Sequence, residues 1–382
     1  MTPADVLGFD PFDEGFLREP YAKYRQLREQ GELFRTPAGL NVITTHALVS
    51  EMLRDARFGH GRDPLAKGKQ DEPVESFLLM DPPDHTRLRA LVSRAFTPRM
   101  IERLRPRIES IAAELIAGMG EEADLVEEFA YPLPLLVITE MLGVPPEDEE
   151  RFRGWSDLLA RSLDPLPTPE LTRSSEQASL EFRDYFRALI AERRARPGED
   201  LLSALAQVEE LTEAELLATC VLLLVAGHET TVNLIANGVL NLARQDTLHR
   251  AAADPKQVVE EVLRYDPPVQ LTLRFALEDA SLGGTPIPAG TPVLALLGAA
   301  NRDPAVFDDP DRFDLDRGPG RHLAFGLGIH FCLGATLARL EGEIALRSLA
   351  EAAPGLKLVE AAPPYKENLV LRGLSRLQVR LS

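Results

Sequence analysis

Cysteine is scarce in this chain, which has only Cys220 and Cys332 among its 382 residues. If Cys332 holds a metal, no disulfide partner remains for Cys220, and a chain without disulfides fits a reducing compartment. The sequence also lacks a run of about 20 apolar residues, and its start lacks the basic and then apolar pattern of a signal peptide. We therefore expect a soluble, cytoplasmic protein that does not span a membrane.

Positive charge is in deficit. The chain carries 42 Lys and Arg against 60 Asp and Glu, so its formal net charge is −18. Nucleic acids and anionic membranes are polyanions and repel such a chain, so we expect neither as a partner. Hydrophobic residues make up 45% of the chain and charged residues 27%, which is typical of a globular protein with a substantial core.

Helical periodicity dominates the chain, with a small β element near its start. A hairpin is predicted from Glu32–Arg35 and Leu40–Thr44, joined by a turn that contains Pro and Gly. Residues 59–73 are predicted to be a surface loop, because they are rich in Gly, Pro and charge. Residues 164–169 are rich in Pro and are predicted to form a lid over a substrate entrance.

The most informative stretch is the glycine-rich run Phe325-Gly326-Leu327-Gly328-Ile329-His330-Phe331-Cys332-Leu333-Gly334. Its glycines permit positive φ and let the backbone approach a flat ligand closely. A helical pattern follows, so Cys332 is predicted at a helix N-terminus, where unpaired N–H groups and the helix dipole favour a thiolate. A thiolate suits a redox metal, and we interpret Cys332 as an iron ligand. The alternative is a buried cysteine that only fills space in a core.

A second stretch, Leu216–Leu240, is a long apolar helical pattern interrupted by Ala226-Gly227-His228-Glu229-Thr230-Thr231. Gly and Thr are poor helix formers, and an acid is costly in apolar surroundings. Thr hydroxyls that bond back to a carbonyl also bend helices. We therefore expect a bent, locally opened helix with a groove at this point. Alternatively, the acid and the threonines form a polar contact between helices.

Charged residues also cluster on other predicted helices. His85 and Arg89 follow an expected N-cap at Asp84 and point the same way, while Glu261 and Arg264 share a helix face. Taken alone, such pairs are common on solvated surfaces. Seven arginines and a single acid lie between residues 85 and 107, a basic segment that either steers an acidic partner or is only a solvated face. These arginines are Arg87, Arg89, Arg94, Arg99, Arg103, Arg105 and Arg107.

The run from Phe325 to Gly334 resembles the haem-binding loop of the cytochromes P-450, with every defined position present. Ala226–Thr231 resembles the Ala-Gly-x-Asp/Glu-Thr-Thr pattern of the same family, with Glu rather than the commoner Asp at position 229. Further segments match from Asp81 onward in family order and spacing. The resemblance implies a mainly α fold with small β-sheets, a single domain over residues 1–382, and a haem between the 216–240 helix and the Cys332 loop.

The resemblance also implies roles for individual residues. Cys332 is the implied axial thiolate ligand of haem b, Thr230 is implied to hydrogen-bond bound oxygen, and Glu229 is implied to relay protons. The implied partners of the haem propionates are His85, Arg89, Arg274 and His330. The implied buried network that supports the haem loop consists of Glu261, Arg264 and Arg312. By their offsets from the motifs, the expected walls of the substrate pocket are Leu222, Val225, Ala226, Gln270, Thr272 and Leu374.

The implied reaction is activation of dioxygen with electrons from a separate ferredoxin or flavodoxin-type donor and its reductase, followed by hydroxylation or epoxidation of a substrate. In this family the basic segment 85–107 is the natural candidate for the docking face of the donor. Because the expected pocket walls are mostly apolar, we expect a terpenoid, steroid, fatty acid or polyketide.

Three alternatives to a monooxygenase remain. The first is a haem-thiolate peroxygenase or isomerase, against which the intact Glu229-Thr230 pair argues. The second is a haem-based sensor or carrier without turnover. The third is a structural protein without haem, in which Cys332 is a core residue and the motifs are coincidence.

Overall fold

The computed structural model describes residues 3–61, 76–161, 169–318 and 320–381. The chain forms two compact units. Unit 1 comprises residues 1–61, 112–130 and 230–382, and unit 2 comprises residues 62–111 and 131–229. The predicted loop residues 62–73 and 164–168 lie outside the described residues.

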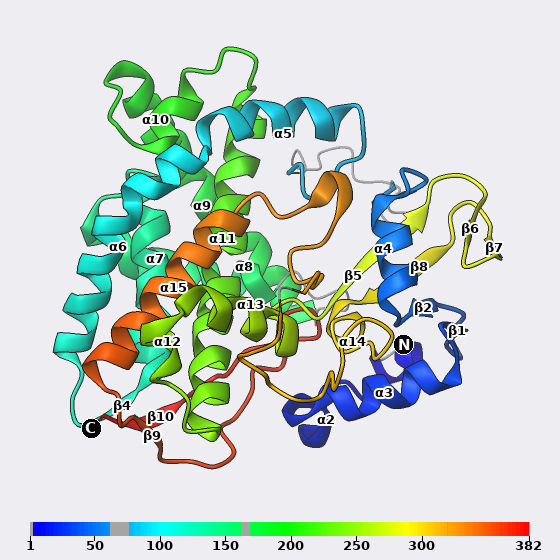
Figure 1. Ribbon diagram of the computed structural model, residues 1–382. Helices are drawn as coiled ribbons and strands as arrows, with labels where there is room; N and C mark the ends of the chain where they lie inside the picture. The colour runs from blue at the N-terminus through cyan, green and yellow to red at the C-terminus, as the bar shows by residue number, and fades with distance from the viewer. Residues whose placement is uncertain (1–2, 62–75, 162–168, 319, 382) are drawn as a thin grey trace. The chain divides into compact units, whose positions relative to one another are not determined.

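Helices make up most of the described chain (Figure 1). The α-helices are α1 (Pro3–Leu7), α2 (Glu14–Arg18), α3 (Pro20–Gln30), α4 (His46–Arg54), α5 (Asp84–Ala95), α6 (Pro98–Gly118), α7 (Pro132–Met141), α8 (Glu149–Arg161), α9 (Pro169–Ala195), α10 (Leu201–Ala206), α11 (Glu213–Arg244), α12 (Arg250–Ala253), α13 (Pro255–Tyr265), α14 (Leu297–Ala300) and α15 (Ala335–Ala352). Shorter π or 3₁₀ turns are η1 (Val126–Ala130), η2 (Pro146–Asp148) and η3 (Gly328–His330). The strands are β1 (Leu33–Arg35), β2 (Asn41–Ile43), β3 (Phe58–Gly59), β4 (Glu122–Asp124), β5 (Leu271–Ala276), β6 (Ala280–Leu282), β7 (Thr285–Ile287), β8 (Pro292–Leu296), β9 (Lys357–Leu358) and β10 (Gln378–Arg380). The predicted mainly α fold with small sheets is confirmed.

The largest sheet of unit 1 has the strand order β1-β2-β8-β5-β3. Strands β1 and β2 pair antiparallel with Arg35 opposite Asn41, which confirms the predicted hairpin. Strand β8 runs parallel to β2 and antiparallel to β5, with Val293 opposite Arg274. Helix α4 packs its apolar residues, Met52 among them, into one hydrophobic cluster with residues of β8 such as Val293. The sheet therefore holds Arg274 on β5, an interior strand paired with β8 and β3.

Glycines allow close helix packing elsewhere in unit 1. A Cβ added at Gly342 of α15 would lie 3.1 Å from a methyl carbon of Leu234 in α11 and 3.3 Å from one of Val259 in α13. A Cβ at Gly238 of α11 would lie 3.2 Å from a methyl carbon of Leu346. Small residues at these two points let α11, α13 and α15 approach one another, since their neighbours fill the space that a side chain would need. The C-terminal half of α11 is thus embedded in the core of unit 1.

Unit 2 is built from helices, and its described residues contain no strand. Helices α8 and α9 are joined by an aromatic cluster whose rings meet mostly edge to face, with centroids 4.5–5.8 Å apart. Its members are Phe152, Trp155, Phe182, Tyr185 and Phe186. Such contacts add about 0.5–1.5 kcal/mol per pair to the burial of the rings, so α8 and α9 form a stiff pair.

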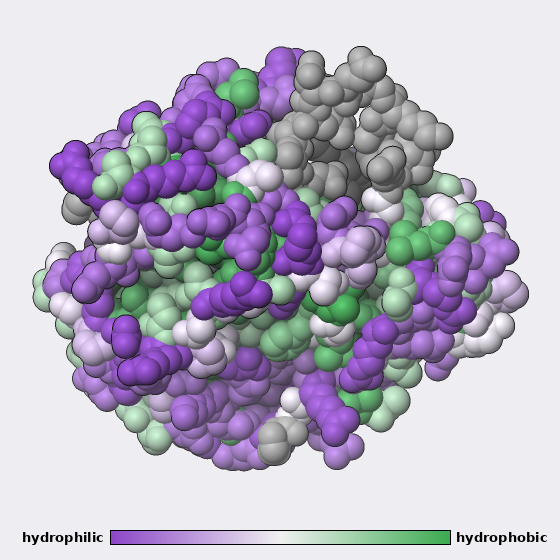
Figure 2. All heavy atoms as spheres, turned by 90° about the horizontal axis from the view of Figure 1, so that it is seen from above, coloured by the Kyte–Doolittle hydropathy of each residue, from purple (hydrophilic) through white to green (hydrophobic). Residues whose placement is uncertain are grey.

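The surface and the core differ in polarity. Hydrophilic residues cover much of the face seen in Figure 2, with hydrophobic residues visible between them. Among the described residues, α11 is the one helix long and apolar enough to cross a membrane. In its most apolar 18-residue window, however, 67% of the residues are buried. Helix α11 is therefore read as a core helix of a folded domain.

Candidate functional site

The loop from Phe325 to Gly334 has a backbone that glycine makes possible. Gly326 and Gly328 have φ of 67° and 69°, in the left-handed region that favours glycine. A Cβ at Gly328 would also lie 2.2 Å from the carbonyl oxygen of Leu53, so no other residue fits there. The amide of Cys332 donates a hydrogen bond of 2.9 Å to the carbonyl of Phe325, which closes the loop. The glycine spacing therefore sets the conformation that presents Cys332.

Cys332 stands three residues before α15, close to the predicted helix N-terminus. Its side chain is exposed, whereas Cys220 of α11 is buried and burial raises the pKa of the Cys220 thiol. Neither cysteine forms a disulfide. An exposed sulfur at a helix N-terminus is available to a ligand, while a buried thiol with a raised pKa is chemically inert. The idea that Cys332 is only a core residue is therefore wrong.

Two predicted cofactor contacts lie in unit 1 with Cys332. His330 belongs to the turn η3, and its ring meets that of His60 edge to face, with centroids 4.8 Å apart. Arg274 on β5 is 7% exposed, and its guanidinium donates hydrogen bonds of 2.8 Å to the Thr272 hydroxyl and the Leu273 carbonyl. Both side chains are held by defined neighbours, as groups that fix the orientation of a bound carboxylate need to be.

The other predicted contacts lie in unit 2, on α5. His85 is buried, and Arg89 follows one turn later. Burial, reinforced by the positive charge of Arg89, lowers the pKa of His85, so the ring is neutral at pH 7. The predicted N-cap is wrong by one residue. Asp84 is the first residue of α5, Pro83 occupies the cap position, and no side chain caps the helix there.

Helix α11 runs unbroken from Glu213 to Arg244, so the predicted opening of the helix at residues 226–231 is wrong. Tertiary packing on both sides of the helix outweighs the weak helix propensity of Gly and Thr. Ala226 is exposed, and Gly227 and Thr230 are partly exposed, whereas Glu229 is buried. Ala226, Gly227 and Thr230 lie within about 100° around the helix. The stretch therefore presents an uncovered face of small side chains, without a break in the backbone.

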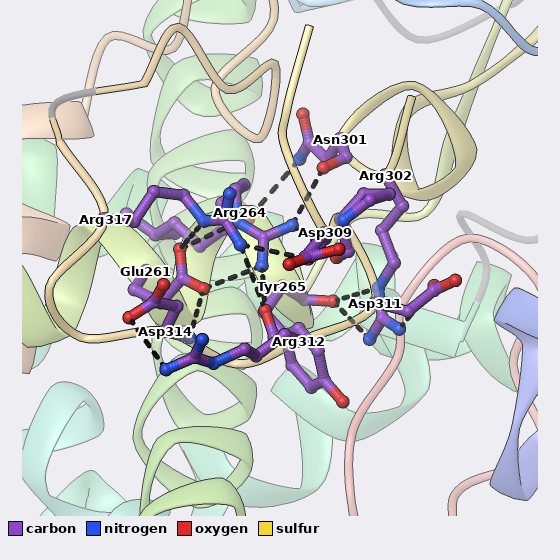
Figure 3. A network of polar contacts seen from close by, with 12 residues as sticks. Glu261, Arg264, Tyr265, Asn301, Arg302, Asp309, Asp311, Arg312, Asp314 and Arg317 are labelled. Carbon is purple, nitrogen blue, oxygen red and sulfur yellow. Dashed lines mark hydrogen bonds and ion pairs between the residues drawn. The ribbon is translucent and has the colours of Figure 1, made fainter. Parts of the chain in front are cut away.

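The Glu261–Arg264 pair lies at the centre of a buried ion network (Figure 3). Arg264 donates two hydrogen bonds of 2.7 Å to the Glu261 carboxylate and further bonds to the carbonyls of Pro310 and Arg312. The prediction that the Arg312 side chain completes this network is wrong. That side chain is 68% exposed, and Arg312 takes part through its carbonyl. The second cation is Arg317, whose Nε lies 3.5 Å from Glu261. Glu-x-x-Arg spacing on a helix could identify the pair, but nothing in the sequence distinguishes Arg317 from Arg312.

The expected pocket residues have different surroundings. In unit 2, Leu222 and Val225 are buried beside the exposed Ala226. In unit 1, Thr272 is partly exposed and Leu374 is buried. The amide of Gln270 donates to the Pro267 carbonyl at 2.7 Å and lies 3.4 Å from the Tyr21 hydroxyl. Gln270 is therefore held in the polar interior of unit 1, and we remove it from the proposed wall.

Three buried polar features were missed by the sequence analysis. Glu341 of α15 is 1% exposed, although an acid among Leu337, Leu340 and Ile344 could have drawn attention to it. Arg372 and Asp266 form a buried pair at 2.7 Å, which the Tyr21 hydroxyl joins by donating to Asp266. His228 is fully buried between two other elements of unit 2.

Unit 1 also contains an open groove of about 580 Å³ beside the Cys332 loop. Its lining mixes aromatic, basic and acidic side chains, among them Phe325, Phe331, Arg54, Arg339, Glu51 and Glu260. Because both signs of charge are present, the groove has no strong preference for a charged ligand.

Comparison with known proteins agrees with this fold and these motifs. A family model described as "Cytochrome P450" matches residues 256–351. The chain is 42% identical to cytochrome P450 107B1 of Saccharopolyspora erythraea, over 100% of this chain and 99% of that protein. It is also 42% identical to the cytochrome P450 monooxygenase PikC of Streptomyces venezuelae, over 98% of this chain and 94% of that one.

Solved structures show the same likeness. The structure of CYP164A2 of Mycobacterium smegmatis with econazole bound superimposes with a TM-score of 0.90, at 44% identity over 97% of this chain and 98% of that one. P450BioI in complex with an acyl carrier protein ligated to hexadec-9Z-enoic acid gives a TM-score of 0.91, at 36% identity over 97% and 100% of the two chains. The chain therefore belongs to the cytochrome P450 family of monooxygenases, whose members bind haem b through a cysteine thiolate.

Proposed function

We propose that this enzyme holds haem b through Cys332 and inserts one oxygen atom of dioxygen into a hydrophobic organic substrate. The other oxygen atom leaves as water, with two electrons and two protons consumed. The single observation that carries the proposal is the exposed Cys332 thiol on a loop that its glycines preset. Haem with a thiolate ligand supplies the reductive activation of dioxygen.

The residues of the chain fit this cofactor. Its two carboxylates need cations or N–H donors, which Arg274 and His330 offer in unit 1 and His85 and Arg89 offer in unit 2. Neutral His85 can donate one N–H, and a carboxylate beside it would favour its charged form. The exposed Ala226 supports an apolar, flat ligand at this part of α11, since a larger side chain would occupy the space.

Proton movement is assigned to Glu229 and Thr230. Glu229 is a buried acid next to an uncovered helix face, where it can take a proton from solvent and pass it on. The partly exposed Thr230 hydroxyl can donate one hydrogen bond and accept another. Together they can transfer protons while the apolar neighbours Leu222 and Val225 exclude bulk water.

The proposed substrate is apolar, of the terpenoid, steroid, fatty acid or polyketide class. The retained wall residues in unit 2 are Leu222, Val225 and Ala226. The names of relatives support this range. They include a polyketide biosynthesis P450 of Bacillus subtilis at 39% identity and a vitamin D(3) 25-hydroxylase of Pseudonocardia autotrophica at 40% identity. We also propose a role in secondary metabolism and a cytoplasmic location.

Electrons are proposed to come from an acidic ferredoxin or flavodoxin that docks on part of the basic segment 85–107. Three of its arginines are already paired with acids, namely Arg87 with Glu215, Arg105 with Glu102, and Arg107 with Glu140. By contrast Arg94, Arg99 and Arg103 are exposed and have no ion-pair partner among the described residues. Arginines without an ion-pair partner attract an acidic protein more strongly than arginines already paired with acids. The proposed docking surface is therefore narrowed to Arg94, Arg99 and Arg103.

An absorption titration tests the central proposal. The purified ferric protein should show a thiolate-type haem band, and one substrate class should shift it toward the high-spin form. Cys332→Ala should lose that band, while Cys220→Ala, which changes the buried cysteine, should keep it. A Cys332→Ala protein that retained the thiolate band would overturn the proposal.

Two further variants separate the assigned roles. Thr230→Ala should divert consumed dioxygen to hydrogen peroxide, and unchanged coupling would remove Thr230 from its role.

Arg94→Glu with Arg99→Glu should raise the KM for a ferredoxin about 10-fold at low salt, without changing the substrate-induced spectral shift. The matched control, Arg173→Glu with Arg196→Glu, reverses two exposed charges elsewhere in unit 2 and should leave that KM unchanged.

A further inference from the structure

In the core of unit 2, the buried His228 ring makes hydrogen bonds to two other segments of the chain. His228 lies in α11, Ser156 in α8, and Tyr131 directly before α7. All three side chains are at most 5% exposed. The neighbouring residue along α11 is Glu229, to which the proposed function gives proton transfer.

Both nitrogens of the His228 ring are engaged. Nδ1 lies 2.7 Å from the Ser156 hydroxyl, and Nε2 lies 3.2 Å from the carbonyl oxygen of Tyr131. A carbonyl can only accept, so Nε2 carries the hydrogen, and in the neutral ring Nδ1 accepts from Ser156. The ring of Tyr131 also packs edge to face on that of His228, with centroids 4.4 Å apart. The imidazole is therefore held in one orientation and one tautomer.

The partners of His228 are themselves fixed. The Tyr131 hydroxyl donates a hydrogen bond of 3.1 Å to the carbonyl of Arg153, one turn before Ser156 in α8. The Arg153 guanidinium lies over the Tyr131 ring, 4.6 Å from its centroid. Helix α8 is in turn joined to α9 by the aromatic cluster. The hydrogen-bond partners of His228 are therefore held in place by the stiff α8–α9 pair.

We propose that His228 is a positioning residue for Glu229. Consecutive side chains of an α-helix point about 100° apart, so a ring fixed at position 228 sets the direction in which the next side chain leaves the helix. The hydrogen bonds to Ser156 and Tyr131 fix the His228 ring, and the fixed ring in turn orients the Glu229 carboxylate. This inference rests on the proposed function, because it assigns His228 a role only through the proton transfer of Glu229.

The variants separate positioning from simple stabilisation. His228→Phe keeps a ring against Tyr131 but removes both hydrogen bonds, and Ser156→Ala removes one. His228→Gln restores a donor and an acceptor. The matched control is Thr219→Val, because Thr219 is also buried in α11 and, among the described residues, its hydroxyl bonds only to the Glu215 carbonyl of its own helix.

The measurements are dioxygen consumption with a ferredoxin and its reductase, the fraction of that dioxygen recovered as hydrogen peroxide, and the solvent deuterium isotope effect. None of them requires the natural substrate. We expect His228→Phe to lower consumption at least about 10-fold and to raise the isotope effect, within the ~100-fold loss that a misplaced group causes. Ser156→Ala should lower the rate of dioxygen consumption about 3-fold. His228→Gln should recover most of the wild-type rate. Thr219→Val should match the wild type.

A readout independent of turnover is amide hydrogen exchange across residues 225–232, which we expect to speed up in His228→Phe and to recover in His228→Gln. If exchange speeds up while consumption and its isotope effect stay at wild-type values, His228 is only structural and the inference is wrong. If Glu229→Gln itself leaves consumption and its isotope effect unchanged, the fault lies in the proposed function of Glu229.

Discussion

Glu261 and Glu341 are two acids of unit 1 with nearly equal burial and opposite surroundings. Glu261 is 2% exposed and Glu341 is 1% exposed. Glu261 receives two hydrogen bonds from Arg264, one of 2.8 Å from the amide of Asp314, and the nearby charge of Arg317. Glu341 has a hydrogen bond with Thr231, and its Oε2 has no partner among the described residues.

The difference shows that burial alone does not decide whether a carboxyl group favours its ionised or its neutral form. The surroundings of Glu261 supply positive charge and N–H donors, so its negative charge is balanced. Around Glu341 the dominant effect is burial, which raises its pKa well above the ordinary range despite the Thr231 hydroxyl. Burial therefore favours the neutral form of Glu341. Glu261 belongs to a supporting ion network, whereas Glu341 is a carboxyl group held in an apolar core.

The largest expected effect comes from breaking the Glu261 network. Arg264→Ala should lower the free energy of unfolding by about 3–5 kcal/mol, because it leaves the buried Glu261 carboxylate without its bidentate partner. Urea unfolding measures this change. Arg312→Ala is the matched control and should change stability by less than about 0.5 kcal/mol, since that side chain is 68% exposed. Equal effects of the two variants would contradict the network described here.

An intermediate effect of opposite sign is expected at Glu341. Glu341→Gln keeps the shape and removes the ionisation, so it should stabilise the protein by on the order of 1 kcal/mol at pH 8. The sign follows from linkage. The native state keeps a proton that the unfolded chain releases above its ordinary pKa near 4.5, so wild-type stability falls as the pH rises beyond that value.

Thermal unfolding at pH 5 and pH 8 measures the Glu341 effect. The advantage of Glu341→Gln should be small at pH 5 and should grow toward pH 8. Glu261→Gln is the contrasting variant and should destabilise the protein at pH 8. A Glu341→Gln advantage that did not change with pH would mean that the native acid is ionised.

The smallest effect is expected at Glu260, whose side chain is 37% exposed. Partial burial raises the pKa of Glu260, but hydrogen bonds from His322 and Arg339 outweigh it and lower the pKa to about 2. Because the native state favours the ionised Glu260, this carboxylate stabilises the fold above pH 4.5, and the stabilisation is lost as the pH falls toward 2. Solvent screening keeps it below about 1 kcal/mol.

The Glu260 contribution can be isolated by comparing the wild type with Glu260→Gln in urea at pH 6 and pH 3. The gap between the two proteins should narrow at the lower pH, because at pH 3 the unfolded chain binds a proton at Glu260 while the native carboxylate, with its pKa of about 2, stays mostly ionised. A gap that widened on acidification would show that the assigned hydrogen bonds do not stabilise the ionised form.

Much of the fold was predictable because its patterns are local. The hairpin β1–β2 follows from two short runs around a Pro-Gly turn, and the helix after Cys332 follows from apolar residues at helical spacing. The i, i+3 spacing of Glu261 and Arg264 places both on one helix face, and the structure pairs them. Local propensity was a poor guide at residues 226–231, where packing keeps α11 continuous.

By itself, the sequence determined the family, the mainly α architecture, and the loop that presents Cys332, because glycine positions and helical periodicity act over a few residues. Only the tertiary structure decided that Arg317 and not Arg312 supplies the second cation near Glu261, that burial raises the pKa of Glu341, and that His228 is hydrogen-bonded to Ser156 of α8. Each of these depends on which distant segment packs against a given side chain. The state of a buried polar group follows from those partners, and no local pattern records them.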